Sequence, residues 1–334
     1  MSFEIEVLLV SFAISIILGI ITIPILRKLK VGQIERDDGP ASHLKKQGTP
    51  TMGGIVIIIT MIIGTVATAV YLFATGEAEL AAKLMPILLL TIGFGAIGFI
   101  DDYKKLVLKN TEGLKPSYKM LGLLVISVAY VLYLIEGLKL GTDTYIPILK
   151  QYITLPLYIY VPAAICVILA TTNAINLTDG IDGLSTSVTT IILTCLTIIS
   201  VIFGVKEVTV FGSILIGTCL GFLLFNLYPA KVMMGDTGSL AIGGLLGTIA
   251  VLGKFEILLI LIAGVFVMET LSVIIQVFSF KTTGKRVFKM APVHHHFELC
   301  EWSEKKVVTV FAAVSAILSV LAVLLYFLSS RGII

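Results

Sequence analysis

Residues 83–105 read KLMPILLLTIGFGAIGFIDDYKK, a run with no charged residue between Lys83 and Asp101 that ends in two acids and two lysines. A helix needs roughly 20 apolar residues to cross about 30 Å of hydrocarbon, and this run is close to that length. Similar runs recur along the chain, in which 57% of residues are hydrophobic, 13% are charged and the mean hydropathy is +1.05. These values exclude an ordinary soluble domain.

The apolar runs predict an all-α, polytopic integral membrane protein with about ten transmembrane helices, forming one domain over residues 1–334. Because the runs are continuously apolar rather than alternating, they exclude a membrane β-barrel. The predicted spans cover residues 3–26, 52–75, 83–100, 118–136, 155–174, 186–204, 208–227, 237–253, 256–280 and 306–329.

Basic residues predict the orientation of these spans, since cytoplasmic loops of membrane proteins are enriched in Lys and Arg. Eighteen of the 24 basic residues lie in odd-numbered loops, which follow the first, third, seventh and ninth spans. Glu4 and Glu6 precede the first apolar run while Arg27 and Lys28 end it, which reverses the charge order of a signal peptide. We therefore expect a retained first span, both termini outside the cell and cytoplasmic odd-numbered loops.

Five groups of polar residues lie in odd-numbered loops or at the span ends beside them. They are His43–Lys46 with Thr49–Gly54, Asp101–Asp102, Asn176–Asp182, Asn226 with Gly235–Ser239, and His294–Glu298. Because these loops emerge on one side of the membrane, all five groups can build a single site at the cytoplasmic face. An ion-coupled transporter is expected to carry its acids near the middle of its spans instead.

The adjacent acids Asp101 and Asp102 end the third span. Two carboxylates at a membrane boundary repel each other and lose solvation, so at least one needs a cation or a lysine partner. Successive side chains on a helix point about 100° apart, so both acids cannot easily bind one ion. We expect one to face a reacting group and the other to support it, with a solvated helix end as the alternative.

Two further groups combine acids with glycines. In Asn176–Gly183 (NLTDGIDG), Asp179 and Asp182 are three residues apart and share one face of a helical turn, or else only cap the helix. In Met234–Leu240 (MGDTGSL), a helix begins, and helix N-termini favour anions such as phosphate. Asp236 in this group either holds a magnesium ion that bridges to phosphate or merely caps the helix.

The remaining polar residues suit a phosphorylated ligand. His294, His295 and His296 are adjacent, a poor spacing for one zinc ion on a helix, so we expect them to donate to phosphate or sugar oxygens. The alternative is an unstructured polar loop. Asn226 supplies an amide that can recognise a base or a sugar. Glu269 lies within a span, where an acid is functional by default, although a packing role is an equal alternative.

Carboxylates for magnesium, lysines and histidines for phosphate, and amides for a base together predict phosphoryl transfer from a nucleotide substrate. A site at the membrane surface predicts a lipid as the second substrate. The net charge of +3 reflects membrane topology and gives no indication of nucleic-acid binding. An anion transporter is the alternative from another class.

Five motifs, in this order, closely resemble the phospho-N-acetylmuramoyl-pentapeptide transferase family of the polyprenyl-phosphate N-acetylhexosamine-1-phosphate transferase superfamily. They are Lys46–Gly54 (KQGTPTMGG), Gly98–Asp102 (GFIDD), Asn176–Leu184 (NLTDGIDGL), Met234–Leu240 (MGDTGSL) and Pro292–Glu298 (PVHHHFE). The first and last motifs favour the muramoyl-pentapeptide branch. The branch that uses UDP-N-acetylglucosamine is the alternative.

The resemblance implies a magnesium-dependent phosphotransferase. Its reaction would transfer phospho-N-acetylmuramoyl-pentapeptide from UDP to undecaprenyl phosphate, giving lipid I and UMP in the first membrane step of peptidoglycan synthesis. It also implies a bacterial plasma membrane location, ten helices and a homodimer. Direct attack by the lipid phosphate and a covalent phospho-aspartate intermediate both fit the residues, and we favour direct attack.

The resemblance also implies roles for individual residues. Asp236 matches the family's magnesium-binding aspartate, and Asp101 and Asp102 match its paired catalytic aspartates, one of which assists the attack. Lys105 and His294 complete the expected catalytic set. The expected substrate-binding residues are Lys46, Thr51, Lys119, Asn176, Asp179, Gly180, Asp182, Asn226, Met233, Ser239, Gln276, His295 and His296.

Two residues depart from the family pattern. The family usually has a phenylalanine three residues before its magnesium aspartate, where the ring stacks on uracil, but this chain has Met233. A thioether covers a base face without a π surface, so we expect weaker uridine stacking. The second departure is Glu301, where the family pattern has glycine.

Overall fold

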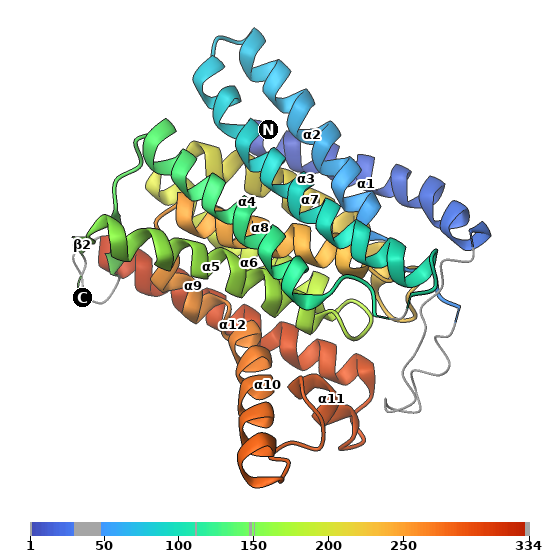
Figure 1. The fold of residues 1–334 in the computed structure, drawn as a ribbon. Coiled ribbons are helices and arrows are strands. Elements are labelled where there is room, and N and C mark those ends of the chain that lie inside the picture. The colour runs from blue at the N-terminus through green and yellow to red at the C-terminus, as the bar shows by residue number, and fades with distance from the viewer. Residues whose placement is uncertain (1, 30–47, 111, 147–148, 150, 331–334) are drawn as a thin grey trace.

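The structure is a computed structural model that describes residues 2–29, 48–110, 112–146, 149 and 151–330 (Figure 1). Within these residues, ten helices are long and apolar enough to cross a membrane by length and composition. This confirms the predicted all-α, polytopic membrane architecture.

The part of the chain that the structure describes contains ten long helices and two short α-helices. The long helices are α1 (Phe3–Lys28), α2 (Gly54–Ala74), α3 (Ala78–Leu106), α4 (Pro116–Leu132, continued by the π-helical η2, Tyr133–Gly137), α5 (Leu157–Thr178), α6 (Leu184–Phe203), α7 (Lys206–Asn226), α8 (Gly235–Leu252), α10 (Gly264–Thr283) and α12 (Glu304–Ser330). The short helices are α9 (Glu256–Ile262) and α11 (Val293–Glu298).

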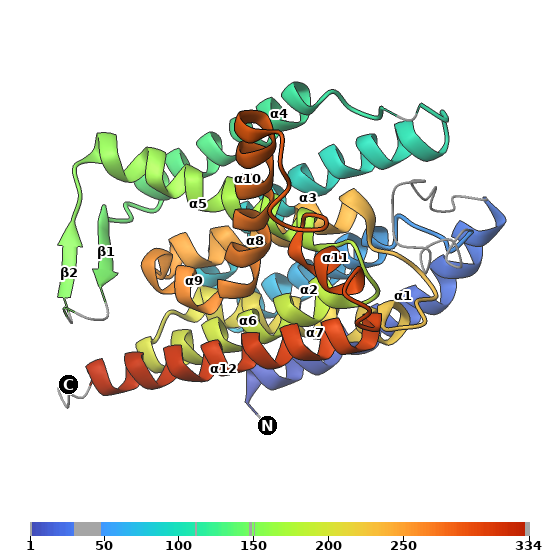
Figure 2. The same cartoon turned by 90° about the horizontal axis from the view of Figure 1, so that it is seen from below.

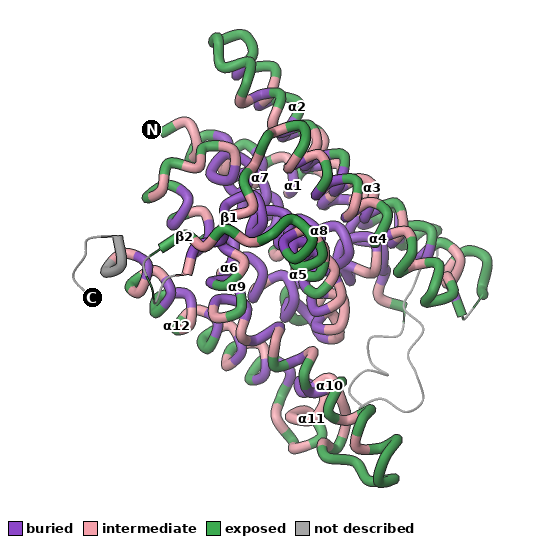
Figure 3. The backbone as a smooth tube through the Cα atoms, turned by 60° about the vertical axis from the view of Figure 1, so that its left-hand side comes forward, coloured by how far each residue is buried: buried purple, intermediate pink, exposed green. Residues whose placement is uncertain are grey.

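Helix α8 is the centre of the bundle, and Figure 3 shows it surrounded by the other helices. In its apolar window 89% of the residues are buried, against 22% in α1 and in α10. A Cβ on Gly243 would lie 2.5 Å from Thr172 Cα, and one on Gly244 would lie 2.0 Å from the Phe94 ring. Small residues let helices approach closely in lipid, where no hydrophobic force drives them together. The glycines of α8 therefore explain its central position between α3 and α5.

The prediction of one continuous span over residues 256–280 is wrong. The helix ends at Ile262, Ala263 adopts φ −86° and ψ 22°, and α10 begins at Gly264. A Cβ on Gly264 would lie 2.7 Å from Leu318 Cδ1 of α12, so glycine permits this close packing. Figure 1 shows α10 leaving the bundle, with α11 beside it. An Ala-Gly pair inside an apolar run changes the hydropathy little, so hydropathy did not locate the break.

A small hairpin, not foreseen from the sequence, connects η2 to α5. Its strands β1 (Asp143–Ile146) and β2 (Gln151–Thr154) are antiparallel, with Thr144 opposite Ile153. Figure 2 shows the hairpin at the opposite end of the bundle from α11.

The turn after α8 and the first residue of α9 hold this hairpin. Thr144 Oγ1 donates to Glu256 Oε2 at 2.7 Å, Tyr160 Oη donates to Glu256 Oε1 at 3.0 Å, and Lys254 Nζ donates to the Gly141 carbonyl oxygen. Burial raises the pKa of Glu256 and lowers the pKa of Lys254. Both charged side chains nevertheless have hydrogen-bond partners, which come from the hairpin, the residues before it and α5.

Candidate active site

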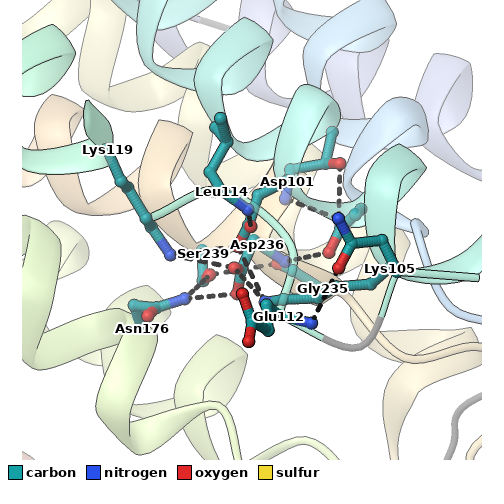
Figure 4. A network of polar contacts seen from close by, with 12 residues as sticks. Asp101, Lys105, Glu112, Leu114, Lys119, Asn176, Gly235, Asp236 and Ser239 are labelled. Carbon is teal, nitrogen blue, oxygen red and sulfur yellow. Dashed lines mark hydrogen bonds and ion pairs between the residues drawn. The ribbon is translucent and has the colours of Figure 1, made fainter. Parts of the chain in front are cut away.

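Charged side chains from α3, α4 and α8 meet at one end of the bundle (Figure 4). Lys105 Nζ lies 2.7 Å from Asp101 Oδ2 and 3.1 Å from Asp236 Oδ2. Lys119 Nζ lies 2.8 Å from Asp236 Oδ2 and 3.5 Å from Asp101 Oδ2. The Asp101 side chain is 3% exposed and that of Lys105 is 39% exposed. We call these four residues the carboxylate–lysine cluster, and its lysine side is open to solvent.

Asp102 has different partners from its neighbour. Its Oδ1 accepts from Asp236 N at 3.1 Å, and its Oδ2 accepts from Thr237 N at 2.8 Å and Thr237 Oγ1 at 2.6 Å. The first N–H groups of a helix have no partners within the helix, and this carboxylate satisfies two of them in α8. Asp101 thus faces the lysines while Asp102 fixes the helix that carries Asp236. These contacts agree with the expected division between the two acids, whose chemical roles stay predictions.

Asn176 from α5 holds the other oxygen of Asp236. Its Nδ2 donates to Asp236 Oδ1 at 2.8 Å and to Ser239 Oγ at 2.8 Å, and Ser239 Oγ in turn donates to the Gly235 carbonyl oxygen. Both carboxylate oxygens of Asp236 therefore have partners. Burial raises the pKa of Asp179, just after α5, well above its ordinary value, and so do the negative charges of Asp236 and Asp102.

The Lys46–Gly54 motif, described from Gly48 onward, packs on the start of α8. Gly53 N donates to Met233 O at 2.9 Å, and Gly54 N donates to Met234 O at 2.9 Å. Gly235 has φ +73°, a left-handed conformation that favours glycine. A Cβ on Gly235 would lie 3.0 Å from Thr51 Oγ1, which places Thr51 near the cluster. Lys46 lies outside the described residues.

Three expected substrate-binding residues are buried near the end of α7. Asn226 Oδ1 accepts from Thr186 Oγ1 at 2.8 Å, and its Nδ2 donates to Val232 O at 3.1 Å. Asp182 Oδ2 accepts from Ala230 N at 2.8 Å. Met233 is 4% exposed. The two polar side chains hold the segment between α7 and α8, and direct substrate contacts by all three residues stay predictions.

The histidine motif forms helix α11, so the alternative of an unstructured loop is wrong. His295 Nδ1 lies 2.8 Å from Glu298 Oε2, and His296 Nδ1 accepts from Lys289 N at 3.1 Å. Gln276 of α10 holds the segment that connects α10 to α11. Its Oε1 accepts from Val287 N and Phe288 N at 3.0 Å each, and its Nε2 donates to Phe288 O at 3.0 Å.

His294 joins α11 to two other parts of the site. Its Nδ1 lies 3.1 Å from Glu269 Oε2 of α10, and both side chains are 0% exposed. A Cβ on Gly180 would lie 2.4 Å from His294 Nε2, so the turn after α5 packs directly on this ring. The sequence marked Glu269 only as an acid within a span. The structure places it beside the histidine motif.

The donor set fits magnesium, although the described residues contain no group of three His, Cys, Asp or Glu side chains placed to hold a metal. Magnesium is usually bound by one or two carboxylates together with water and substrate phosphates. Asp101 and Asp236 supply two carboxylates that face the same two ammonium groups. Such a pair suits an ion shared with a diphosphate.

Comparisons with known proteins identify the family of this chain. The family model of glycosyl transferase family 4 matches residues 84–254, and the model of phospho-N-acetylmuramoyl-pentapeptide-transferase signature 1 matches residues 46–58. Together they include three of the five polar groups and, from Lys46 onward, the first group.

Curated phospho-N-acetylmuramoyl-pentapeptide-transferases from three bacteria align over nearly the whole chain. The Acetivibrio thermocellus protein is 47% identical over 317 residues, covering 94% of this chain and 93% of the relative. The Clostridium botulinum protein is 49% identical over 314 residues, covering 94% of each chain. The Bacillus cytotoxicus protein is 50% identical over 315 residues, covering 94% of this chain and 95% of the relative. The resemblance in the motifs is thereby confirmed, and the chain belongs to the phospho-N-acetylmuramoyl-pentapeptide-transferase family.

Proposed function

We propose that the protein transfers phospho-N-acetylmuramoyl-pentapeptide from its UDP conjugate to undecaprenyl phosphate, giving lipid I and UMP. Family membership supports this reaction. The structural observation that carries it is the carboxylate–lysine cluster at the ends of membrane-spanning helices. A site in that position can receive a water-soluble nucleotide and a lipid phosphate together.

In the proposed reaction, an oxygen of the lipid phosphate forms a bond to the sugar-bound phosphorus of the UDP conjugate. The bond from that phosphorus to the UMP oxygen breaks, and UMP leaves with the electron pair. Among the described residues, Lys105 and Lys119 contact both carboxylates, and they would stabilise charge on the transferred phosphoryl group. Magnesium, held by Asp236 beside Asp101, would offset the charge of the diphosphate when bound.

Asp101 is the better candidate to assist the attack. It faces the lysines, whereas the oxygens of Asp102 accept hydrogen bonds from the start of α8. The Leu114 N–H donates to Asp101 Oδ1 at 2.6 Å, which stabilises the carboxylate. We propose direct attack by the lipid phosphate, with Asp101 as the assisting group.

We further propose that the protein lies in a bacterial plasma membrane with its catalytic loops in the cytoplasm and both termini outside. The excess of Lys and Arg in the odd-numbered loops supports this orientation. A homodimer remains a prediction.

The test uses purified protein in detergent with undecaprenyl phosphate, magnesium and UDP-N-acetylmuramoyl-pentapeptide, with UMP quantified. Release of UMP that EDTA abolishes is expected. Parallel reactions with UDP-N-acetylglucosamine separate the two branches of the superfamily. Absence of UMP with both nucleotides, in a folded sample, would favour an anion transporter and contradict the proposal.

A further inference from the structure

Glu269 and His294 form a buried pair between α10 and α11. Glu269 lies on the inward face of α10 with Val265, Phe266 and Ser272. Its Oε2 lies 3.1 Å from His294 Nδ1, and both side chains are 0% exposed. An acid buried in this way does not contribute to the solubility of the protein. Among the described residues, His294 is its only charged or ring partner.

The distance between Nδ1 and Oε2 requires a hydrogen atom between them. A protonated Glu269 would donate to a bare Nδ1, whereas an ionised Glu269 has only acceptors, so in the ionised state the hydrogen belongs to Nδ1. In a neutral ring, the second nitrogen, Nε2, then carries a lone pair and accepts hydrogen bonds. Carboxylates fix the tautomer and the orientation of metal-binding histidines in the same way.

Nε2 of His294 has no hydrogen-bond partner among the described residues, although it is buried. The same is true of Glu269 Oε1. Buried polar atoms almost always have partners, so an exception at a candidate active site points to a ligand that supplies one. The His295 ring, whose centroid lies 4.1 Å away, packs against His294.

The missing partner is expected at the turn that follows α5. Nε2 faces Gly180, where a Cβ would lie only 2.4 Å away. Asp179 lies beside Gly180 in this turn, and its carboxyl group is influenced by the charge of Asp236. Asn176, near the end of α5, donates to Asp236 at the start of α8. The turn is therefore next to the carboxylate–lysine cluster. Because the turn covers Nε2, a ligand can reach this atom only if the turn around Gly180 shifts.

We propose that Glu269 is a positioning residue that holds His294 as the Nδ1–H tautomer, so that Nε2 accepts a hydrogen bond from the nucleotide-sugar substrate. The matching donor is a sugar or ribose hydroxyl or a peptide N–H, rather than a phosphate oxygen. The identity of the ligand rests on the proposed function, whereas the tautomer does not.

The tautomer is tested by nitrogen NMR without substrate. The chain has four histidines, so ring-¹⁵N-labelled protein in detergent gives few signals, and His294→Ala identifies that of His294. At neutral pH we expect a protonated Nδ1 and a bare Nε2. Glu269→Gln, which keeps an acceptor, should retain this state, and Glu269→Leu should move the proton to Nε2. A bare Nδ1 in the wild-type protein, or an unchanged tautomer in Glu269→Leu, would overturn the proposal.

Kinetics test whether Glu269 acts through His294. Glu269→Leu should lower kcat/KM for lipid I formation about 10- to 100-fold, by analogy with the loss on mutating residues that orient metal-binding side chains. Glu269→Gln should lower it less. In the His294→Ala background, Glu269→Leu should change kcat/KM by no more than about twofold, because both changes remove one shared interaction.

Ser272→Ala is the matched control. Ser272 is buried on the same face of α10, and its Oγ donates to the Glu269 carbonyl oxygen at 2.6 Å without contacting His294. It should retain wild-type kcat/KM. Losses that multiply in the double variant would overturn the positioning role. The expected tautomer in a protein that forms no lipid I would leave that role intact and contradict only the proposed function.

Discussion

The two ends of α8 hold different kinds of polar cluster. At its beginning, Lys105 and Lys119 both contact Oδ2 of Asp236, at 3.1 and 2.8 Å. Beyond its other end, Glu256 accepts hydrogen bonds from two neutral hydroxyls, and Lys254 donates to a backbone carbonyl and to the Tyr160 hydroxyl and lies 3.7 Å from Asp143 Oδ1. Lysines that share one carboxylate oxygen can be redirected to a phosphate, whereas charges held mainly by hydroxyls and a backbone carbonyl of the fold stabilise its geometry. Acids beside lysines therefore indicate a phosphate-binding site only where the lysines share one carboxylate oxygen and a lysine side chain is partly exposed to solvent.

The strongest test of this contrast is Asp236→Asn. Because Asp236 would hold the magnesium ion that offsets the diphosphate charge, removing its carboxylate charge should lower the rate of UMP release about 100- to 1,000-fold, the order seen when one stabilising contact to the transition state is lost. The denaturation midpoint in detergent should change little, because asparagine retains an oxygen for Asn176. Both quantities are measured on the same preparation. Activity close to wild type would show that the two clusters do not differ as described.

Lys254→Met tests the other end of the helix. The substitution removes donors to Gly141 and Tyr160, so the free energy of unfolding should fall by about 1–3 kcal/mol. The rate of UMP release should stay close to wild type. Chemical denaturation and the UMP assay measure the two effects. Lys206→Met is the control, because Lys206 pairs with Glu77 at 3.6 Å at an exposed position. A loss of activity comparable to that of Asp236→Asn would contradict a purely structural role.

Met233→Phe sharpens the comparison at the catalytic end. An aromatic ring should restore stacking on uracil and tighten binding of the nucleotide substrate about 2- to 10-fold, within the range measured for aromatic pairs. Binding of UDP-N-acetylmuramoyl-pentapeptide to purified protein is measured by calorimetry. The Met233 side chain is buried, so a matched Met233→Leu variant controls for repacking. Equal affinities for the phenylalanine and leucine variants would contradict the stacking explanation.

Asp179→Asn tests whether the catalytic end is destabilised by its own charges. Folding raises the pKa of Asp179. Its stabilising contribution is therefore complete below the ordinary pKa of an aspartate, about 3.9, and is lost as the pH rises through the pKa of the folded state.

Asparagine is neutral at every pH, so Asp179→Asn should have a higher denaturation midpoint than wild type at pH 8. The difference should shrink as the pH falls. Thermal denaturation in detergent at a series of pH values measures it. A difference that does not depend on pH would exclude the charge as its cause.

The smallest expected effect is that of Glu301→Gly, next to the histidine motif. Glu301 has φ +66°, a conformation that costs a side chain energy and glycine little, which explains why the family pattern has glycine here. The substitution should raise the free energy of unfolding by about 1 kcal/mol. Glu301→Ala, which keeps the Cβ, should give no such gain in the same denaturation assay.

Hydropathy predicted the ten spans because crossing a membrane is a local property of each run of residues. It missed the break at Ala263, because the residues on both sides are apolar. It also missed the cluster around Lys254, which as a single basic residue in a short loop carries no signal of burial. That signal depends on which side chains the hairpin brings to it.

The sequence predicted which residues lie near the candidate site better than it predicted the contacts between them. Topology indicated that Asp101, Asn176 and Asp236 lie on one side of the membrane, and the structure joins them. The sequence could not show that Asp102 binds the start of α8 or that Asn226 has two internal partners. Those contacts depend on how each helix is rotated about its axis. The spacing of apolar residues specifies this rotation within a span but not at its polar end.

The glycines around α8 have a consequence for inhibition. A Cβ on Gly98 would lie 2.1 Å from Asp236 O, and one on Gly54 would lie 2.1 Å from Gly238 N. Any larger residue at Gly54 or Gly98 would push the backbone of the site apart. Both glycines are buried, so a compound bound at the start of α8 depends on a backbone spacing that these positions cannot change without damage to the protein itself. Resistance to such a compound would have to arise elsewhere in the molecule.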